Sequence, residues 1–237
     1  MSNVPVRLQL ICDDAHDGTF NMAADEFLLR RQIQSKDPNV ILRFYRFSEP
    51  TLTVGYGLWG LAVSKVDSGI PFVRRLTGGG IVSHGISDLT YSLIAPIAGN
   101  IPFEKVKDSY LLIHQQLSEA FRSLGIKTEL FEKKCCAPGA AFFERRRGRN
   151  LFCFDSPVLH DVMLEGKKIA GAAQKRTQGY LLQQGSIAWK LLLEVCPPLS
   201  ESVFFERFAQ GIGDLFNLSR EEVLLPAEEL KNASATL

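Results

Sequence analysis

Three consecutive glycines, Gly78-Gly79-Gly80, constrain the fold of this chain more than any other stretch. Glycine loses more conformational freedom on folding than any other residue, so three in a row inside a helix or strand would be costly. They follow Arg74-Arg75 and precede Ile81 and Val82, which are typical of a strand. The pattern indicates a loop next to strands, whose N–H groups can face an anionic or carbonyl-bearing ligand. The glycines alone are equally compatible with a flexible turn.

Predicted strands come mostly in adjacent groups along the chain, with helices set apart from them. Runs rich in β-branched and aromatic residues predict strands at 6–11, 40–47, 51–55, 72–75, 89–94, 151–154, 161–164, 168–174 and 180–189. Apolar residues at helical spacing predict helices at 20–33 and 103–124. The C-terminal part, 197–237, is predicted to be helical, with a capping-box pattern at Ser219-Arg220-Glu221-Glu222 that opens its last helix.

Regular alternation of strand and helix is absent from this pattern, which argues against a Rossmann fold. The glycine run also matches neither the dinucleotide-binding pattern nor the phosphate-binding loop of nucleotide triphosphatases. Adjacent strands with segregated helices favour the α+β class, with a mixed, largely antiparallel sheet and helices packed on it. We expect a single domain over 1–237, because no low-complexity linker or internal repeat divides the chain.

Charge, hydropathy and cysteine usage exclude several functional classes. The net charge is +1 with a pI of about 7.6, so the chain has no global bias toward nucleic acid or membrane surfaces. No apolar run approaches the ~20 residues of a membrane span, and the N-terminus lacks a signal pattern, so a cytoplasmic protein is expected. The five cysteines are scattered and form no Cys-x-x-Cys pair, which predicts neither a disulfide framework nor a metal site.

Four sequence blocks together resemble the superfamily of lipoate–protein ligases and LipM-type octanoyltransferases. Residues 21–26 alone are explained as the start of a packed helix, and each block is weak by itself. The blocks are Asn21-Met22-Ala23-x-Asp25-Glu26, Pro50-Thr51-Leu52-Thr53-Val54-Gly55, Arg74-Arg75-x-x-Gly78-Gly79-Gly80-x-Val82-x-His84 with Asp88-Leu89-Thr90-Tyr91-Ser92, and Gly166-Lys167-Lys168-Ile169-Ala170-Gly171-Ala172-Ala173-Gln174-x-Arg176 with Gln184-Gly185-Ser186-Ile187. They occur in the family's order within about 18–189, and the tail after Pro197 adds nothing to the resemblance.

The resemblance implies a fold like the catalytic core of biotin and lipoate protein ligases. It also implies chemistry on a medium-chain acyl group that ends as an amide on a lysine of a lipoyl-carrier domain. Two mechanisms are open. A transferase would take an octanoyl or lipoyl group from acyl carrier protein through a cysteine thioester, without a cofactor. A ligase would activate free lipoate with ATP and Mg²⁺ as lipoyl-AMP.

Cys153 is the residue that distinguishes these two mechanisms, because its position resembles that of the nucleophile in LipM-type octanoyltransferases. The thiolate is the reactive form of cysteine, and a nearby lysine would increase its fraction. The alternative is an inert buried thiol, since Phe152 and Phe154 flank it. With Cys153 present, we expect the transferase; the ligase is the second reading, and a non-catalytic acyl-carrier-binding protein is the third.

The resemblance also assigns roles around the nucleophile. Lys168 would stabilise negative charge on the acyl carbonyl, although an exposed hairpin charge is the alternative and fits Lys167 better. Arg75 and the three glycines would hold an anionic part of the substrate. His84 would either line the pocket or be a structural histidine. The remaining substrate-binding candidates are Gly171 and Ala172, and no role is assigned to Cys135 or Cys136.

The resemblance further implies the partners. Acyl carrier protein would be the donor. Lipoyl domains of 2-oxoacid dehydrogenase complexes, or the H protein of the glycine cleavage system, would be the acceptor. Neither nucleic acid nor membrane is expected as a partner.

Overall fold

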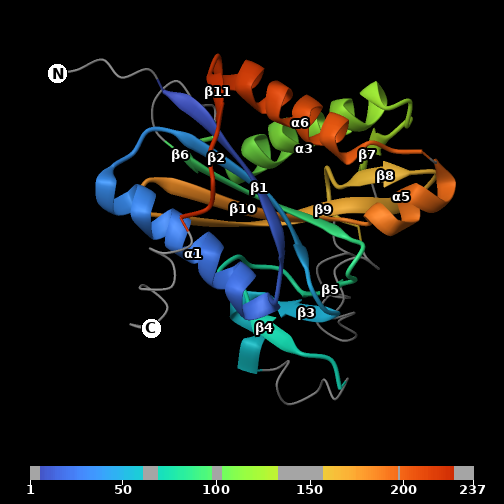
Figure 1. Cartoon of the computed structure of the whole chain (residues 1–237), viewed down its shortest axis with the longest axis horizontal. Coiled ribbons are helices and arrows are strands. Elements are labelled where there is room, and N and C mark those ends of the chain that lie inside the picture. Colours follow the sequence, from blue (N-terminus) through green and yellow to red (C-terminus); the bar gives the residue numbers. More distant parts are fainter. Residues whose placement is uncertain (1–5, 61–68, 98–102, 133–156, 197, 227–237) are drawn as a thin grey trace, which may run out of the picture.

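The computed structural model describes residues 6–60, 69–97, 103–132, 157–196 and 198–226 (Figure 1). Its largest unit is an eight-stranded sheet. The strands of this sheet are β1 (Arg7–His16), β2 (Val40–Phe47), β6 (Leu89–Pro96), β7 (Glu129–Leu130), β8 (Val162–Leu164), β9 (Lys167–Thr177), β10 (Tyr180–Ile187) and β11 (Ser219–Glu222). Their order across the sheet is β11-β1-β2-β6-β10-β9-β8-β7.

The strand directions confirm the expected mixed, largely antiparallel sheet. Strand β1 runs parallel to both of its neighbours, β2 and β11. Every other neighbouring pair in this sheet is antiparallel, including the hairpin of β9 and β10. Short turns connect β8, β9 and β10 directly, which is why the sequence places these predicted strands next to one another.

Helices cover both faces of the large sheet (Figure 1). Helices α3 (Val106–Ser123) and α6 (Glu201–Phe216) lie on one face, and α1 (Gly18–Ser35) lies on the other. The short helix α5 (Trp189–Val195) follows β10. Successive strand residues point to opposite faces, so β2 contributes Leu42 and Phe44 to the core under α3 and α6, and Ile41 to the core under α1. Burial on both faces explains why this strand reads as a nearly continuous apolar run.

A three-stranded sheet lies beside α1 and consists of β3 (Thr51–Val54), β4 (Phe72–Arg74) and β5 (Ile81–His84). Strand β3 is central, parallel to β4 and antiparallel to β5. A 3₁₀ turn, η1 (Tyr56–Leu58), follows it. Residues 75–80, called the glycine loop from here on, therefore pass from one edge of this sheet to the other, close to the end of β3.

The expected helix at residues 219–222 is wrong, because Ser219–Glu222 forms the edge strand β11. The helical expectation for the preceding segment is met by α6, whose N-cap is Ser200. In β11 the backbone pairs with β1, and Glu221 accepts hydrogen bonds from Arg7 and Gln9 of that strand. This pairing with a segment far away in the sequence outweighs the local capping pattern.

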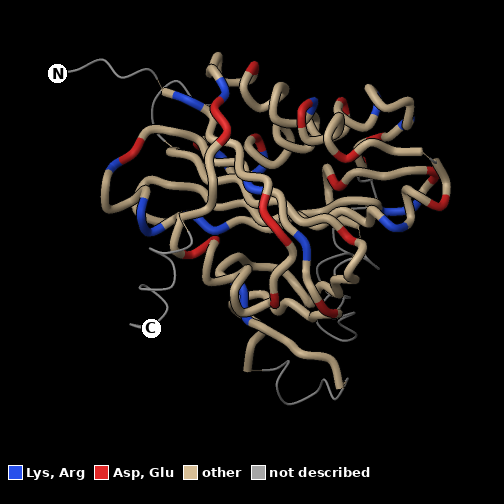
Figure 2. Tube along the Cα trace, viewed as in Figure 1, with Lys and Arg blue, Asp and Glu red and all other residues tan. Residues whose placement is uncertain are grey.

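The charge distribution matches the small net charge. Figure 2 shows acidic and basic residues interspersed over the trace, as expected for a net charge of +1. Among the described helices, none is long and apolar enough to cross a membrane.

Candidate active site

The glycine loop is held in shape by its own first residue, Arg75, whose side chain is buried. The Nη1 atom of Arg75 donates to the carbonyl oxygen of Thr53 at 2.8 Å, and its Nη2 atom donates to the carbonyl oxygens of Gly78 at 2.7 Å and Gly80 at 2.8 Å. Backbone carbonyls near a glycine run would otherwise face water or one another. The guanidinium therefore shapes the loop, and its charge lies directly beneath the loop.

The loop packs so closely on the end of β3 that glycine is required there. A Cβ atom on Gly55 would lie 2.1 Å from the carbonyl oxygen of Gly79, and Gly79 itself has a φ of +88°. Both positions therefore exclude ordinary side chains. A Cβ atom on Gly78 would meet nothing within 4 Å. The loop is thus fixed on its inner side and open at Gly78, which suits contact with a ligand.

His84 lies on β5 and is buried beside this arginine. Its Nε2 atom is 2.9 Å from the hydroxyl of Thr53, and its ring stacks on Phe47 at 4.2 Å between centroids. Burial and the charge of Arg75 lower the pKa of His84 to about 3, so the ring is neutral at pH 7. Its Nδ1 atom is buried without a hydrogen-bond partner in the described part of the chain. The contacts are those of a structural histidine, and a pocket-lining role stays a prediction.

A buried carboxylate, that of Asp25 on α1, connects helix and sheet beneath the loop. One of its oxygens accepts from Arg43 Nη1 at 2.8 Å and from the Ser92 hydroxyl at 2.8 Å. The other accepts from the Tyr45 hydroxyl at 3.0 Å and from Gln184 Nε2 at 2.7 Å. Asp25 and Arg43 are both fully buried. Burial, followed by the charge of Asp25, raises the pKa of Tyr45 well above its usual range, so this hydroxyl stays protonated.

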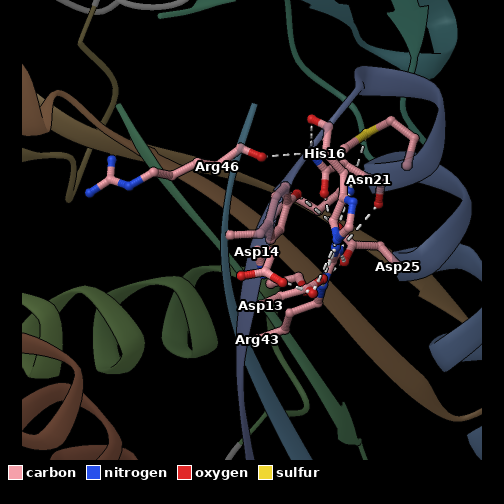
Figure 3. A network of polar contacts seen from close by, with 11 residues as sticks. Asp13, Asp14, His16, Asn21, Asp25, Arg43 and Arg46 are labelled. Carbon is pink, nitrogen blue, oxygen red and sulfur yellow. Dashed lines mark hydrogen bonds and ion pairs between the residues drawn. The ribbon is translucent and has the colours of Figure 1, made fainter. Parts of the chain in front are cut away.

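The guanidinium of Arg43 is satisfied on its other sides by residues of β1 and α1 (Figure 3). Its Nε and Nη2 atoms donate to one oxygen of Asp13 at 2.9 and 2.6 Å, and Nη2 also donates to the side chain of Asn21 at 2.9 Å. A buried charge is tolerated only when it is paired and hydrogen-bonded in this way. The network fixes the position of α1 on the sheet.

Gln184 of β10 extends this network to the glycine loop. While its Nε2 atom donates to Asp25, its Oε1 atom accepts from the hydroxyl of Thr77 at 2.8 Å. Thr77 is fully buried, and its carbonyl oxygen accepts from the backbone N–H of Tyr56 at 3.0 Å. The loop is thereby tied to the large sheet as well as to β3.

A second buried ion pair lies at the β8–β9 hairpin, between Lys168 and Asp161. The Lys168 Nζ atom is 2.8 Å from Asp161 Oδ2, and the two side chains are 6% and 0% exposed. The other carboxylate oxygen accepts from the Tyr110 hydroxyl of α3 at 2.6 Å. That hydroxyl accepts in turn from the backbone N–H of Ala172 at 3.0 Å. Lys167, by contrast, is exposed.

Gly171 provides the space for the Lys168 side chain. A Cβ atom on Gly171 would lie 2.3 Å from Lys168 Cε and 2.5 Å from Lys168 Nζ. Any other residue at this position would displace the ammonium group from its present place. Gly171, which is expected in the site, therefore lies next to Lys168, and Ala172 is linked to the same cluster through its backbone N–H and the Tyr110 hydroxyl.

The strand register puts the ion pair and the glycine loop on one face of the sheet. Arg43 is directly opposite Ser92, Ser92 is opposite Gln184, and Gln184 is opposite Ala173. Directly opposed side chains lie on the same face of a sheet. Gly171 is two residues from Ala173 and shares that face. Lys168 packs over Gly171, and Thr77 is hydrogen-bonded to Gln184. Both residues therefore lie on the same face of the sheet.

The expected nucleophile lies outside the described residues, as do two cysteines to which no role is assigned. Cys153, Cys135 and Cys136 fall in the segment 133–156, which the structure does not describe. Within the described residues, no cluster of three or more His, Cys, Asp or Glu side chains could hold a metal ion.

Reasoning from the sequence missed the polar residues that hold the predicted ones in place. Asp161 and Tyr110 flank Lys168, and Gln184 links the loop to Asp25. Arg43 indicates such a network in the sequence, because an arginine in the middle of a continuous apolar strand requires a buried acid as its partner. The sequence does not identify which acid.

The chain is similar to a known protein family, to named relatives and to solved structures. Residues 17–207 match the family described as lipoyl protein ligase A/B catalytic domain. "Octanoyltransferase LipM" of Geobacillus kaustophilus is 37% identical over 191 residues, which cover 78% of this chain and 65% of that protein. The match thus spans less than two thirds of that relative's length.

Two solved structures share the fold. A bi-partite lipoate protein ligase from Thermoplasma acidophilum, described together with its E2 lipoyl domain, has a TM-score of 0.66 at 19% identity and covers 97% of this chain and 91% of its own. A lipoate-protein ligase A bound with ATP has a TM-score of 0.67 at 20% identity and covers 97% of this chain and 94% of its own. Both confirm the fold that the sequence blocks imply.

Proposed function

The chain belongs to the lipoyl protein ligase A/B catalytic domain family, and from this we propose that it transfers an octanoyl group to a lysine of a lipoyl-carrier domain. Its similarity to octanoyltransferases supports the reaction class. One structural observation carries the proposal: the open glycine loop and the buried Lys168–Asp161 pair lie on the same face of the sheet. In this proposal an acyl group bound on this face contacts loop N–H groups and the ammonium of Lys168 together.

The donor in this proposal is an octanoyl thioester on acyl carrier protein. The thiolate of Cys153 attacks the thioester carbonyl carbon, and the carbon–sulfur bond to the carrier then breaks, releasing the carrier thiol. The acceptor lysine, as a free amine, attacks the new thioester on Cys153. The amide forms, the Cys153 sulfur leaves, and the amine proton passes to it or to solvent. Both steps begin from an activated acyl group, so neither ATP nor another cofactor takes part.

Lys168 and the glycine loop stabilise the oxyanion that forms in each step. Negative charge develops on the carbonyl oxygen when a nucleophile adds, and pre-positioned donors lower that barrier. Lys168 supplies a positive charge that is already desolvated and oriented. Arg75 takes part indirectly in this proposal, since its hydrogen bonds hold the loop carbonyls away from the substrate side. Gly171 lies beside Lys168 in this proposal, and the backbone N–H of Ala172 holds the Tyr110 hydroxyl next to the ion pair.

The acceptors in this proposal are lipoyl domains of 2-oxoacid dehydrogenase complexes or the H protein of glycine cleavage. The family name and the T. acidophilum ligase described with its E2 lipoyl domain support acceptors of this class. The cytoplasmic location expected from the sequence stays a prediction.

The deciding experiment offers the purified protein two acyl sources in separate reactions. One contains octanoyl-acyl carrier protein and a lipoyl domain, and the other contains octanoate, ATP, Mg²⁺ and the same domain. Intact mass of the acceptor should rise by one octanoyl group in the first. Modification only in the second would establish the ligase, which the fold also accommodates. Modification in neither would refute both enzymatic readings in favour of a binding protein.

The nucleophile has its own test with matched cysteine controls. Incubation with octanoyl-carrier should add one hydroxylamine-sensitive acyl group to the wild type but none to Cys153→Ala. Cys12→Ala and Cys196→Ala are the controls. Partial desolvation of the Cys12 thiol, together with the charges of Glu222 and Glu206, raises its pKa, which disfavours the thiolate. Near-normal transfer by Cys153→Ala would exclude the covalent route.

A further inference from the structure

We propose that Asp161 and Tyr110 are positioning residues of the acyl-transfer site, which act by holding the ammonium group of Lys168 in place. This inference rests on the proposed function for the role of Lys168. It assigns parts to two side chains from different elements, α3 and the turn before β8, that the motif blocks do not contain.

The contacts leave the carboxylate of Asp161 no freedom to rotate. Its Oδ1 atom accepts from the Tyr110 hydroxyl at 2.6 Å, and its Oδ2 atom accepts from the backbone N–H of Val158 at 2.7 Å and contacts Lys168 Nζ at 2.8 Å. Tyr110 is fixed in turn by the N–H of Ala172 and by its ring contact with His114, with centroids 4.1 Å apart. The ammonium group of Lys168 thus donates a charged hydrogen bond to a rigid carboxylate.

Folding alone gives little reason for this arrangement. A buried ion pair often contributes no more to stability than apolar residues of the same size, because both charges lose their hydration. The strand also gives up a side chain at Gly171, since a Cβ atom there would lie 2.3 Å from Lys168 Cε. Both features cost stability for the sake of one ammonium position. They are explained if that position matters for a reaction on the face shared with the glycine loop.

The chemistry gives the pair a specific task. An unpaired lysine has four rotatable bonds and would sample many positions, whereas stabilisation of an oxyanion needs the donor within hydrogen-bond distance when charge develops. The Asp161 carboxylate restricts the position of the ammonium group. The Tyr110 hydroxyl keeps that carboxylate in one orientation. Loss of either should therefore slow the acyl-transfer step while substrate binding changes little.

The test is a double-mutant cycle on kcat in steady-state transfer from octanoyl-carrier. Tyr110→Phe removes only the hydroxyl, and Asp161→Asn removes only the charge. Each should lower kcat about 10- to 100-fold with KM for the donor within about twofold, as expected for a misplaced catalytic group. Combined with Lys168→Ala, neither should lower kcat further, because both act through that lysine.

Tyr180→Phe is the matched control, since this buried tyrosine also donates one hydrogen bond, to the carbonyl oxygen of Asp37 at the far end of β10. It should leave kcat unchanged. Equal losses in Tyr110→Phe and Tyr180→Phe, or losses that add to that of Lys168→Ala, would overturn the inference. If Asp161→Asn does not fold, the cycle with Tyr110→Phe still decides.

An experiment that refutes the proposed transferase function gives a different result from one that refutes the positioning roles. If the wild type acylates the acceptor only from octanoate and ATP, transfer is refuted, and the same cycle is then measured on that ligation reaction. Additive losses there would refute the positioning roles independently.

Discussion

Replacing Asp25 by asparagine should destabilise the protein strongly although the side chain keeps its size. The carboxylate accepts four hydrogen bonds, two on each oxygen. An amide can accept on one side only. If the nitrogen of the new amide faces Arg43, the N–H groups of both side chains point at each other and neither has an acceptor. If the nitrogen of the new amide faces Gln184, it meets the Nε2 donor of Gln184 instead. The Gln184 amide cannot flip to relieve this clash without losing the hydrogen bond that Thr77 donates to its oxygen.

The expected loss follows from the charge and from the unsatisfied donor. Removing one partner of a buried ion pair costs about 3–5 kcal/mol when the other charge is left uncompensated. Arg43 keeps Asp13 as a partner at 2.6 Å, so the loss should lie near the lower bound, at about 3 kcal/mol. A chain of 237 residues shifts its Tm by about 2–4 °C per kcal/mol, which predicts a decrease of about 6–12 °C.

The assay is thermal unfolding followed by circular dichroism, with Asp14→Asn as control. Asp14 lies on the same strand as Asp13, is exposed, and its side chain makes no hydrogen bond within the described residues, so the same chemical change there should shift Tm by less than about 2 °C. A Tm of Asp25→Asn that is equally close to wild type would refute the view that this carboxylate holds α1, the sheet and the glycine loop together.

Three further predictions concern acid, packing and charge. Burial lowers the pKa values of His84 and His114 to about 3 and about 4, so both stay neutral in the folded protein while the unfolded chain binds protons below about 6.5. Stability should therefore fall between pH 7 and pH 5 by up to about 2 kcal/mol per histidine, and an unchanged urea midpoint would contradict this. Gly171→Ala should lower kcat about 10- to 100-fold by displacing Lys168, whereas unaltered kinetics would show that the ammonium position is not needed. Lys168→Ala should cost about 2.7–4 kcal/mol of transition-state stabilisation and Lys167→Ala almost none; equal small effects on kcat/KM would remove Lys168 from the site.

Elements with a strong local pattern are predictable from the sequence, and the structure confirms them. The predicted helix at 103–124 corresponds to α3 at Val106–Ser123, because its apolar residues recur at helical spacing and pack on the sheet. The predicted strand at 40–47 coincides with β2. In both, burial itself produces the sequence pattern.

Elements that depend on distant partners are not predictable in this way. The edge strand β11 exists because β1 offers a free edge and Arg7 pairs with Glu221, whereas its local sequence favours a helix start. The helix start containing Asn21 and Asp25 likewise satisfies every local rule. Its second role, accepting hydrogen bonds from the side chain of Arg43, depends on a residue of β2 that lies 18 positions after Asp25.

The residues of the candidate site also fall into two groups, those that the sequence predicts and those that only the fold brings into place. The glycines and Lys168 stand out as sequence blocks because backbone conformation and charge restrict which residues can occupy them. Asp161 is only seven positions before Lys168, yet the sequence does not pair them, because the pairing depends on the irregular register of the β8–β9 hairpin. Tyr110 occupies an ordinary apolar position of α3, and only the fold brings its hydroxyl to Asp161.

In our proposal the fold says more about where an acyl group would bind than about how that group is activated. The loop tied by Gln184 and the ammonium held by Asp161 would stabilise an oxyanion on a thioester and negative charge on an acyl-adenylate equally well. Proteins described as lipoate ligases share this fold, so the fold alone does not select the reaction. What a transferase needs in addition is a nucleophile that a ligase does not require. Acylation of Cys153 is thus the measurement that separates the two reactions, whereas the effects of Asp161 and Tyr110 on Lys168 should be seen in either.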